Sequence, residues 1–325
     1  LHSFPTRRSS DLVAFDGMHV WIANQGGNSV TEVNADDGSW IRTLSGGNYG
    51  FNYPYDIVFD GAHLWISNSG GDSVTEINAD DGAWLRTLSS ADYGFNYPFA
   101  LACDGTHIWI TNYYGGSVSE VDATDGSLVR TVVGSSPRFN GPSGLAYDGT
   151  HMWVTNYGSN SLTELNAADG SWVRTVSGSG YAFNRPSGIA YDGAKLWIPN
   201  QFGNSVTEVD SANGSWVRTL AGGGYGFNGP AGVTFDGYRV WVTNAFGNSV
   251  TDINPADGSF VKLLSGGTFG FNNPAGVTST GGRLWVANAF GGSITRVTTT
   301  DATTLNLALS SSNINNGANR SEERR

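Results

Sequence analysis

The chain has 325 residues and a net charge of −11, from 17 Lys and Arg against 28 Asp and Glu. Hydrophobic residues make up 39% and aromatic residues 12%, which excludes a disordered chain, and the acidic balance argues against a nucleic-acid partner. No apolar run is long enough to cross a bilayer, so membrane insertion is not expected. The single cysteine, Cys103, excludes an internal disulfide framework and a zinc site built from cysteines.

The two ends of the chain differ from everything between them. Residues 1–12 end in R-R-S-S-D-L, and residues 320–325 read R-S-E-E-R-R. These two ends can be encoded by opposite strands of one short DNA, which resembles a sequencing adapter. We therefore expect residues 1–12 to be an adapter-derived tail on a metagenomic fragment. Residues 310–325 are expected to be a disordered tail whose last six residues have the same origin.

Between the tails the sequence repeats every 44 residues, seven times. Each repeat has one tryptophan at a fixed place, followed three residues later by asparagine. These tryptophans are Trp21, Trp65, Trp109, Trp153, Trp197, Trp241 and Trp285. Six F-N-x-P segments join consecutive repeats, and six Asp-Gly pairs precede a tryptophan by five residues. A fixed period of this length indicates a repeat architecture.

Within each repeat we expect four short strands separated by turns. In the second repeat they cover residues 56–59, 64–67, 73–77 and 84–88. The pattern runs from residues 12–15 in the first repeat to residues 303–307 in the seventh. Four strands per repeat are typical of a propeller blade, whereas solenoid repeats, the second possibility, are usually shorter. The expected fold is therefore all-β, one seven-bladed β-propeller over residues 13–309, with four antiparallel strands in each 44-residue blade.

Propeller geometry assigns the loops to two faces. The top face has the loops between second and third strands and the linkers between blades, and the bottom face has the remaining turns. Four histidines, each two residues before a blade tryptophan, are expected as exposed strand ends around the bottom rim: His19, His63, His107 and His151. Spread around a ring, they should not converge on a metal ion. The N-A-D-D-G turn at residues 34–38 is interpreted as an Asx turn rather than a calcium loop.

Charged residues on the third and fourth strands form a regular pattern. Glu32 and Arg42 flank an Asp-Gly turn, so we expect an exposed cross-strand pair there and in the equivalent places. Both partners change together in the last two blades. Blade 6 has Asp252 and Lys262 in place of Glu and Arg, and blade 7 has Arg296 and Asn306. This joint replacement indicates a structural role. The blade tryptophans and the tryptophans of the fourth strands, Trp40, Trp84, Trp172 and Trp216, are all expected to be buried framework residues.

Two stretches carry a resemblance to known repeats. The W-V-T-N of residues 153–156 and the S-L-T-E-L-N of residues 161–166 resemble the repeat of the YVTN-family β-propellers, and the P-S-G-L-A-Y-D-G of residues 142–149 is similar to NHL-type repeats. The resemblance implies a propeller but not one function. The blades also resemble those of the streptogramin B lyases, which implies a metal-dependent lyase with histidines and a glutamate. This chain has asparagine where that repeat commonly has glutamate.

The candidate ligand-binding residues lie in the top-face loops and at the mouth of the channel, mainly in blades 2 to 5. They are Tyr55, Asp56, Phe99, Tyr113, Tyr114, Arg138, Tyr157, Arg185 and Phe202. Tyr113, Tyr114, Tyr157 and Phe202 are expected to be exposed rings in glycine-rich loops. Others replace small residues after the linker proline, and the two arginines are the basic residues of the linkers. Aromatic faces beside amides suit a carbohydrate, and a protein ligand is the second possibility. No catalytic residue, metal ligand or cofactor is predicted.

These observations favour a non-catalytic binding or scaffold propeller, a module of an extracytoplasmic or secreted bacterial protein. Abundant Gly, Asn, Ser and Thr, acidity and one cysteine agree with export. The alternative is a metal-dependent propeller enzyme, streptogramin lyase-like or lactonase-like. That alternative needs His, Asp or Glu side chains that converge at the channel, where the sequence places Asp56.

Overall fold

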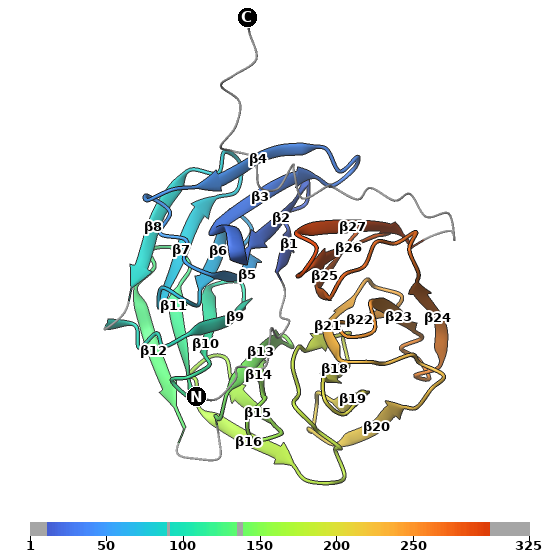
Figure 1. Ribbon diagram of the computed structural model, residues 1–325. Coiled ribbons are helices and arrows are strands. Elements are labelled where there is room, and N and C mark those ends of the chain that lie inside the picture. Colours follow the sequence, from blue (N-terminus) through green and yellow to red (C-terminus); the bar gives the residue numbers. More distant parts are fainter. Residues whose placement is uncertain (1–11, 90–91, 135–138, 300–325) are drawn as a thin grey trace, which may run out of the picture.

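Seven β-sheets stand in a ring in the computed structural model (Figure 1). The structure describes residues 12–89, 92–134 and 139–299. Each sheet is one blade, formed by one 44-residue repeat, and the blades follow one another around the ring in chain order. The prediction of an all-β, seven-bladed propeller is confirmed.

The strands occupy equivalent places in every blade. The innermost strands are β1 (Val13–Phe15), β5 (Pro54–Phe59), β9 (Pro98–Cys103), β13 (Pro142–Tyr147), β17 (Ala190–Tyr191), β21 (Pro230–Phe235) and β25 (Pro274–Thr280). The second strands are β2 (His19–Asn24), β6 (His63–Asn68), β10 (His107–Asn112), β14 (His151–Asn156), β18 (Lys195–Asn200), β22 (Val240–Asn244) and β26 (Arg283–Asn288). The third strands are β3 (Ser29–Asn34), β7 (Ser73–Asn78), β11 (Ser117–Asp122), β15 (Ser161–Asn166), β19 (Ser205–Asp210), β23 (Ser249–Ile253) and β27 (Ser293–Thr298). The outermost strands are β4 (Trp40–Ser45), β8 (Trp84–Ser89), β12 (Leu128–Val133), β16 (Trp172–Ser177), β20 (Trp216–Ala221) and β24 (Phe260–Ser265), and one short 3-10 helix, η1 (Gln25–Gly27), follows β2.

The first and last blades meet and close the ring. Strand β1 packs against β25 of blade 7 on one side and β5 of blade 2 on the other. The fourth strand of blade 7, expected at residues 303–307, lies outside the described residues, as do residues 1–11 and 310–325 of the expected tails. Leu12 is buried, and its carbonyl accepts a hydrogen bond from the amide of Ala23, so this residue belongs to blade 1.

The loops divide between the two faces as expected. On the top face the linker before blade 2 contacts the loop after β6, where the Ser69 amide donates to the Tyr53 carbonyl. On the bottom face the turn after β7 contacts the turn after β5, where the Ala79 amide donates to the Ala62 carbonyl. Within the described residues, no helix is long and apolar enough to cross a membrane.

The seven blade tryptophans form the core between adjacent sheets, and all are buried. In blade 2 the indole N–H of Trp65 donates to Oδ2 of Asp60 at 2.7 Å, while Oδ1 of Asp60 accepts the amide of His63 at 2.7 Å. A buried indole N–H needs such a partner. Five other blades repeat this bond with aspartate, and in blade 7 Thr280 accepts from Trp285 instead.

The expectation that the fourth-strand tryptophans are buried is wrong. Trp40, Trp84, Trp172 and Trp216 are 45–53% exposed. They lie at the start of the outermost strands, where no further sheet covers their outer side. Each indole N–H donates to a threonine hydroxyl three residues later, as Trp84 does to Thr87 at 2.9 Å. These rings lie against the rim of the propeller rather than inside it.

Candidate functional site

An aromatic cluster crosses the top face from blade 2 to blade 5. The Tyr55 and Phe99 ring centroids are 3.8 Å apart, and the Phe99 ring is 5.4 Å from that of Tyr113. Tyr113 in turn lies 6.4 Å from Tyr157, and Cζ of Arg185 lies 4.9 Å from the centre of the Tyr157 ring. Residues from four blades therefore form one continuous group, as the sequence pattern suggested. We call it the top-face cluster.

The exposed part of this cluster is formed by three tyrosines of blade 3. Tyr114 is 56% exposed, and its ring centroid lies 4.6 Å from that of Tyr97 and 5.2 Å from that of Tyr113. Tyr97 and Tyr113 are partly buried. Tyr97 was not among the predicted site residues, although its place before the linker proline could have marked it. It adopts a left-handed backbone (φ 58°), which turns the linker at this point.

The other tyrosine and phenylalanine members support this surface from below. Tyr55 and Phe99 are buried, and Tyr157 is only 1% exposed. The hydroxyl of Tyr157 donates to Oε1 of Gln201 in blade 5 at 3.2 Å. The expectation that Tyr157 is an exposed loop ring is therefore wrong, because neighbouring blades cover it. Arg185, in contrast, is exposed beside it.

Asp56 lies at the central channel, as expected, but its carboxylate is bound to backbone. Oδ1 accepts the amide of Ile57 at 2.8 Å, and Oδ2 accepts the amide of Leu101 in blade 3 at 2.6 Å. The residue is buried and lines a cavity of about 290 Å³ between first strands of several blades. Asp56 thus joins blades 2 and 3 at the channel wall.

Of the two remaining predicted residues, only Phe202 can be placed, and it is not part of the cluster. The ring of Phe202 is exposed, but it pairs with Phe246 of blade 6 at 6.2 Å. Arg138 lies outside the described residues. The top-face cluster therefore has its exposed rings in blade 3 and its exposed cation in blade 5.

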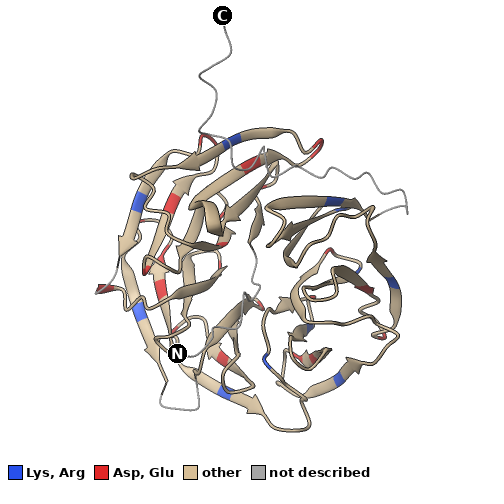
Figure 2. Cartoon of the chain, viewed as in Figure 1, with Lys and Arg blue, Asp and Glu red and all other residues tan. Residues whose placement is uncertain are grey.

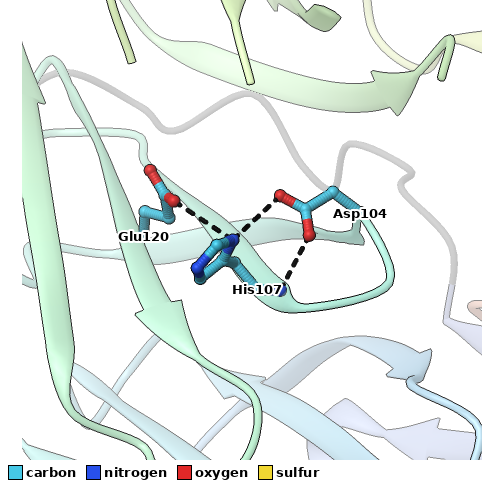
Figure 3. Close-up of side chains that lie close together, drawn as sticks. All are labelled: Asp104, His107 and Glu120. Carbon is cyan, nitrogen blue, oxygen red and sulfur yellow. Dashed lines mark hydrogen bonds and ion pairs between the residues drawn. The ribbon is translucent and has the colours of Figure 1, made fainter. Parts of the chain in front are cut away.

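A second group, on the bottom face, has the composition of a metal site. In blade 3, Nδ1 of His107 lies 3.3 Å from Oδ2 of Asp104 and 3.4 Å from Oε1 of Glu120 (Figure 3). The histidines were expected to be exposed and apart from other ligands, whereas each is partly buried between two carboxylates of its own blade. The strand register could have indicated this, since Glu120 lies opposite Trp109 and His107 shares the same side of β10.

The equivalent positions in other blades identify this group as an ion-pair site. In blade 5 Lys195 replaces the histidine, and its Nζ lies 2.8 Å from Glu208. In blade 6 the residue is Arg239, with its Nε 4.0 Å from Asp252. In these two blades a cation therefore faces the carboxylate that faces histidine in blade 3.

The carboxylate at the centre of this arrangement is buried, which corrects the expectation of exposed pairs. The side chains of Glu32, Glu76, Glu120, Glu164 and Glu208 are 0–1% exposed. Oε2 of each lies 2.6–3.3 Å from Nε of the arginine on the neighbouring outer strand. Burial raises the pKa of Glu120 above its usual value, and Arg130 and His107 oppose that rise. Figure 2 shows the cations on the outer strands and the acids just inside them.

Four of these arginines also connect their blade to the next one. The guanidinium of Arg42 donates to the carbonyls of Asp80 and Asp81, in the turn that follows β7. At the closing junction the connection comes from other strands of blade 7. Arg296 of β27 donates to the carbonyl of Asp36 in blade 1, and Nη1 of Arg283 lies 2.9 Å from Oδ1 of Asp36.

Comparison with known proteins agrees with the fold. No protein-family model and no curated protein matches the chain. Among solved structures it is similar to a streptogramin B lyase, with a TM-score of 0.73 at 16% identity over 89% of this chain and 93% of that one. A catalytically inactive histidine-to-alanine variant of virginiamycin B lyase from Staphylococcus aureus, solved with quinupristin, gives 0.70 at 17% identity over 88% and 94%. Hydrazine synthase from Kuenenia stuttgartiensis gives 0.70 at 18% identity over 92% and 99%.

Fold and comparisons together define the class: the chain is a seven-bladed β-propeller, similar in fold to a streptogramin B lyase. At these identities the likeness concerns the fold alone.

Proposed function

We propose that this protein is a non-catalytic binding propeller whose top-face cluster binds a carbohydrate. The observation that supports the proposal is the asymmetry of the cluster. In blade 3 the exposed ring of Tyr114 stands beside Tyr97 and Tyr113, whereas the equivalent of Tyr114 is glycine in blades 1, 2 and 4. One ligand needs one distinct site on an otherwise repeated ring.

The chemistry of the cluster suits a sugar. The faces of aromatic rings pack against the apolar C–H side of a sugar, and a few polar groups fix its orientation. Around the rings stand the exposed amides of the linker residues Asn96, Asn140 and Asn184. The exposed guanidinium of Arg185 can donate to hydroxyls or to a carboxylate, which favours an acidic sugar.

A glycan array followed by calorimetric titration tests this proposal. Replacing Tyr114 by Ala should weaken binding about tenfold or more, because an exposed ring is lost without disturbing the core. Phe246→Ala is the matched control, since this ring has the equivalent place in blade 6 and is similarly exposed. Arg185→Met should weaken acidic glycans selectively. Binding that survives Tyr114→Ala, or that falls equally in Phe246→Ala, would contradict the proposal.

The alternative is a metal-dependent propeller enzyme, streptogramin lyase-like or lactonase-like. Two observations support this alternative. The fold is similar to that of a streptogramin B lyase, and Asp104, His107 and Glu120 lie together beside a cavity of about 520 Å³ between blades 3 and 4. Replacement of the histidine by Lys195 and Arg239 in other blades favours the binding propeller. Stoichiometric metal that chelation removes, with the loss of a lyase or hydrolase activity, would decide for the enzyme.

We further propose that the protein works outside the cytoplasm. Its acidity, its single cysteine and its abundance of Gly, Asn, Ser and Thr support this location. Sequencing the complete gene tests the proposal, because an exported protein requires an export signal. A full-length gene product that fractionates with the cytoplasm would contradict it.

A further inference from the structure

The group of Asp104, His107 and Glu120 on the bottom face differs from its counterparts in other blades. Within the described residues it is the one group in which His, Cys, Asp or Glu side chains offer three ligand atoms within 4.8 Å of one another. The hydroxyl of Thr106 adds a fourth polar atom, 3.0 Å from Nδ1 of His107. Blades 1 and 2 have no hydroxyl residue at the place of this threonine. Blade 3 therefore gathers more oxygen atoms around its histidine than these blades do.

The spacing of these atoms fits a tetrahedral metal ion. Nδ1 of His107 lies 3.3 Å from Oδ2 of Asp104 and 3.4 Å from Oε1 of Glu120 (Figure 3). A charge-assisted hydrogen bond would bring nitrogen and oxygen to about 2.7–2.9 Å. Zinc bonds of about 2.0–2.1 Å separate neighbouring tetrahedral ligands by about 3.3–3.4 Å. The histidine nitrogen thus lies at ligand distance, rather than hydrogen-bond distance, from both carboxylate oxygens.

Glu120 is held less closely by its arginine than the equivalent glutamates are. Its Oε2 lies 3.3 Å from Nε of Arg130, whereas the same distance is 2.6–2.9 Å in the other four blades. Oε1 of Glu120 is buried and accepts no hydrogen bond from any described residue. A buried carboxylate oxygen needs a hydrogen bond or a cation. Oε1 is therefore the atom of this group at which a cation gains most.

Blade 5 shows that the equivalent position takes a positive charge. Nζ of Lys195 lies 2.8 Å from Oε1 of Glu208, and Nε of Arg218 lies 2.9 Å from Oε2. Both oxygens of this glutamate therefore face a permanent cation. In blade 3 the residue that faces Oε1 of Glu120 is His107, whose imidazole is not permanently charged. A bound divalent ion would supply in blade 3 the charge that lysine supplies in blade 5.

We propose that blade 3 binds one Zn²⁺ ion through Oδ2 of Asp104, Nδ1 of His107 and Oε1 of Glu120. A mixed imidazole and carboxylate set suits zinc, whereas Mg²⁺ and Ca²⁺ take oxygen ligands. The aspartate is fixed for this role, because its Oδ2 accepts the indole N–H of Trp109 at 2.8 Å and its Oδ1 accepts the amide of His107 at 2.7 Å.

The ion joins the turn after β9 to strands β10 and β11. Asp104 lies in that turn, His107 begins β10, and Glu120 is on β11. The cavity of about 520 Å³ is lined by Asp104 and His107, so water can reach the fourth position of the ion. The proposal concerns a bound ion that stabilises the blade, and it stands with or without catalysis.

Calorimetric titration of the chelator-treated full chain with zinc chloride tests the proposal. The wild type should bind one ion saturably, and His107→Lys should weaken that binding about 100-fold or more, because it removes a ligand and places a cation in the site. Lysine at the equivalent position of blade 5 indicates that this variant folds. His63→Lys is the matched control and should bind zinc as the wild type does. In blade 2 the histidine lies 3.6 Å from Asp60, and Arg86 lies 2.7 Å from the glutamate.

Three results would overturn the proposal: no saturable binding up to about 1 mM zinc, wild-type affinity in His107→Lys, or equal weakening in His63→Lys. Glu120→Gln is a second variant, and it should also weaken binding. The melting temperature of the wild type should rise with zinc concentration but not with Mg²⁺, and an unchanged value would equally refute the site. Glycan binding should be the same in His107→Lys and in the wild type, so this test is independent of the proposed carbohydrate site.

Discussion

Asp252 provides a direct test of how the buried carboxylates contribute to stability. It pairs across strands with Lys262, at the place where five other blades have glutamate. Because aspartate is one methylene shorter, its carboxylate stays 4.0 Å from both Lys262 Nζ and Arg239 Nε. Burial raises the pKa of Asp252 from 3.8 to about 6, since these cations compensate only part of the lost hydration.

The magnitude and sign follow from this shift. A rise of about two pKa units corresponds to about 3 kcal/mol between the protonated and ionised forms. The pKa of Asp252 is 3.8 in the unfolded chain and about 6 in the folded protein. Its contribution to stability is therefore fully present below the unfolded pKa and is lost as the pH rises through the folded pKa. Asp252→Asn removes the titration. The unfolding free energy of the variant minus that of the wild type should therefore increase by up to about 3 kcal/mol from about pH 4 to about pH 7.5.

Urea unfolding followed by tryptophan fluorescence at several pH values measures this difference. Asp257→Asn is the control, because hydrogen bonds from Ser259 lower the pKa of this exposed carboxyl. For this variant, the unfolding free energy minus that of the wild type should decrease as the pH rises. Asp252→Glu should bring the carboxylate within reach of Lys262 and lower its pKa. A difference for Asp252→Asn that is flat, or that decreases with rising pH, would refute the reasoning.

Three further predictions concern the framework and use the same unfolding assay. Trp65→Ala should lower the unfolding free energy by about 3–5 kcal/mol and Trp84→Ala by much less, because Trp65 is buried and Trp84 half exposed; equal losses would contradict the assignment. Glu76→Gln should cost about 3 kcal/mol at neutral pH, since the Arg86 guanidinium loses its buried partner; a neutral effect would count against the ion-pair role. Arg296→Met should lower the unfolding free energy by about 1–3 kcal/mol, because the hydrogen bond to Asp36 between blades 7 and 1 is lost. An unchanged urea midpoint would show that this bond does not stabilise the closed ring.

The architecture could be predicted from the sequence because the 44-residue period places the strands of each repeat at equivalent positions. It also placed Tyr55, Phe99 and Tyr113 in one sector, since equivalent positions of neighbouring blades lie side by side. Exposure was harder to predict. Trp65 and Trp84 are the same residue type in two strands of one blade, and only the position of β8 at the rim leaves the second one half exposed. Tyr157 is buried because a neighbouring blade covers it, which the repeat pattern of its own blade does not indicate.

The bottom-face group was missed for a related reason. The histidines were compared across the ring, where they are far apart, rather than across the strands of one blade. The register pairs Trp109 with Glu120, and His107 lies two residues from Trp109 on the same side. That arrangement brings acid, histidine and arginine together in a way that alternation along the strands could have predicted.

The arginine contacts of the closing junction have a consequence for how the chain assembles. Near-identical repeats can pair with the wrong neighbour, because any blade offers any other the same surfaces. The four internal junctions from blades 1 and 2 to blades 4 and 5 each use an arginine of the outermost strand, so these contacts do not distinguish one of these pairs of blades from another. Arg283 and Arg296 reach Asp36 from the second and third strands of blade 7. This non-repeated contact marks the last blade as the partner of the first, and so disfavours ring closure after six units.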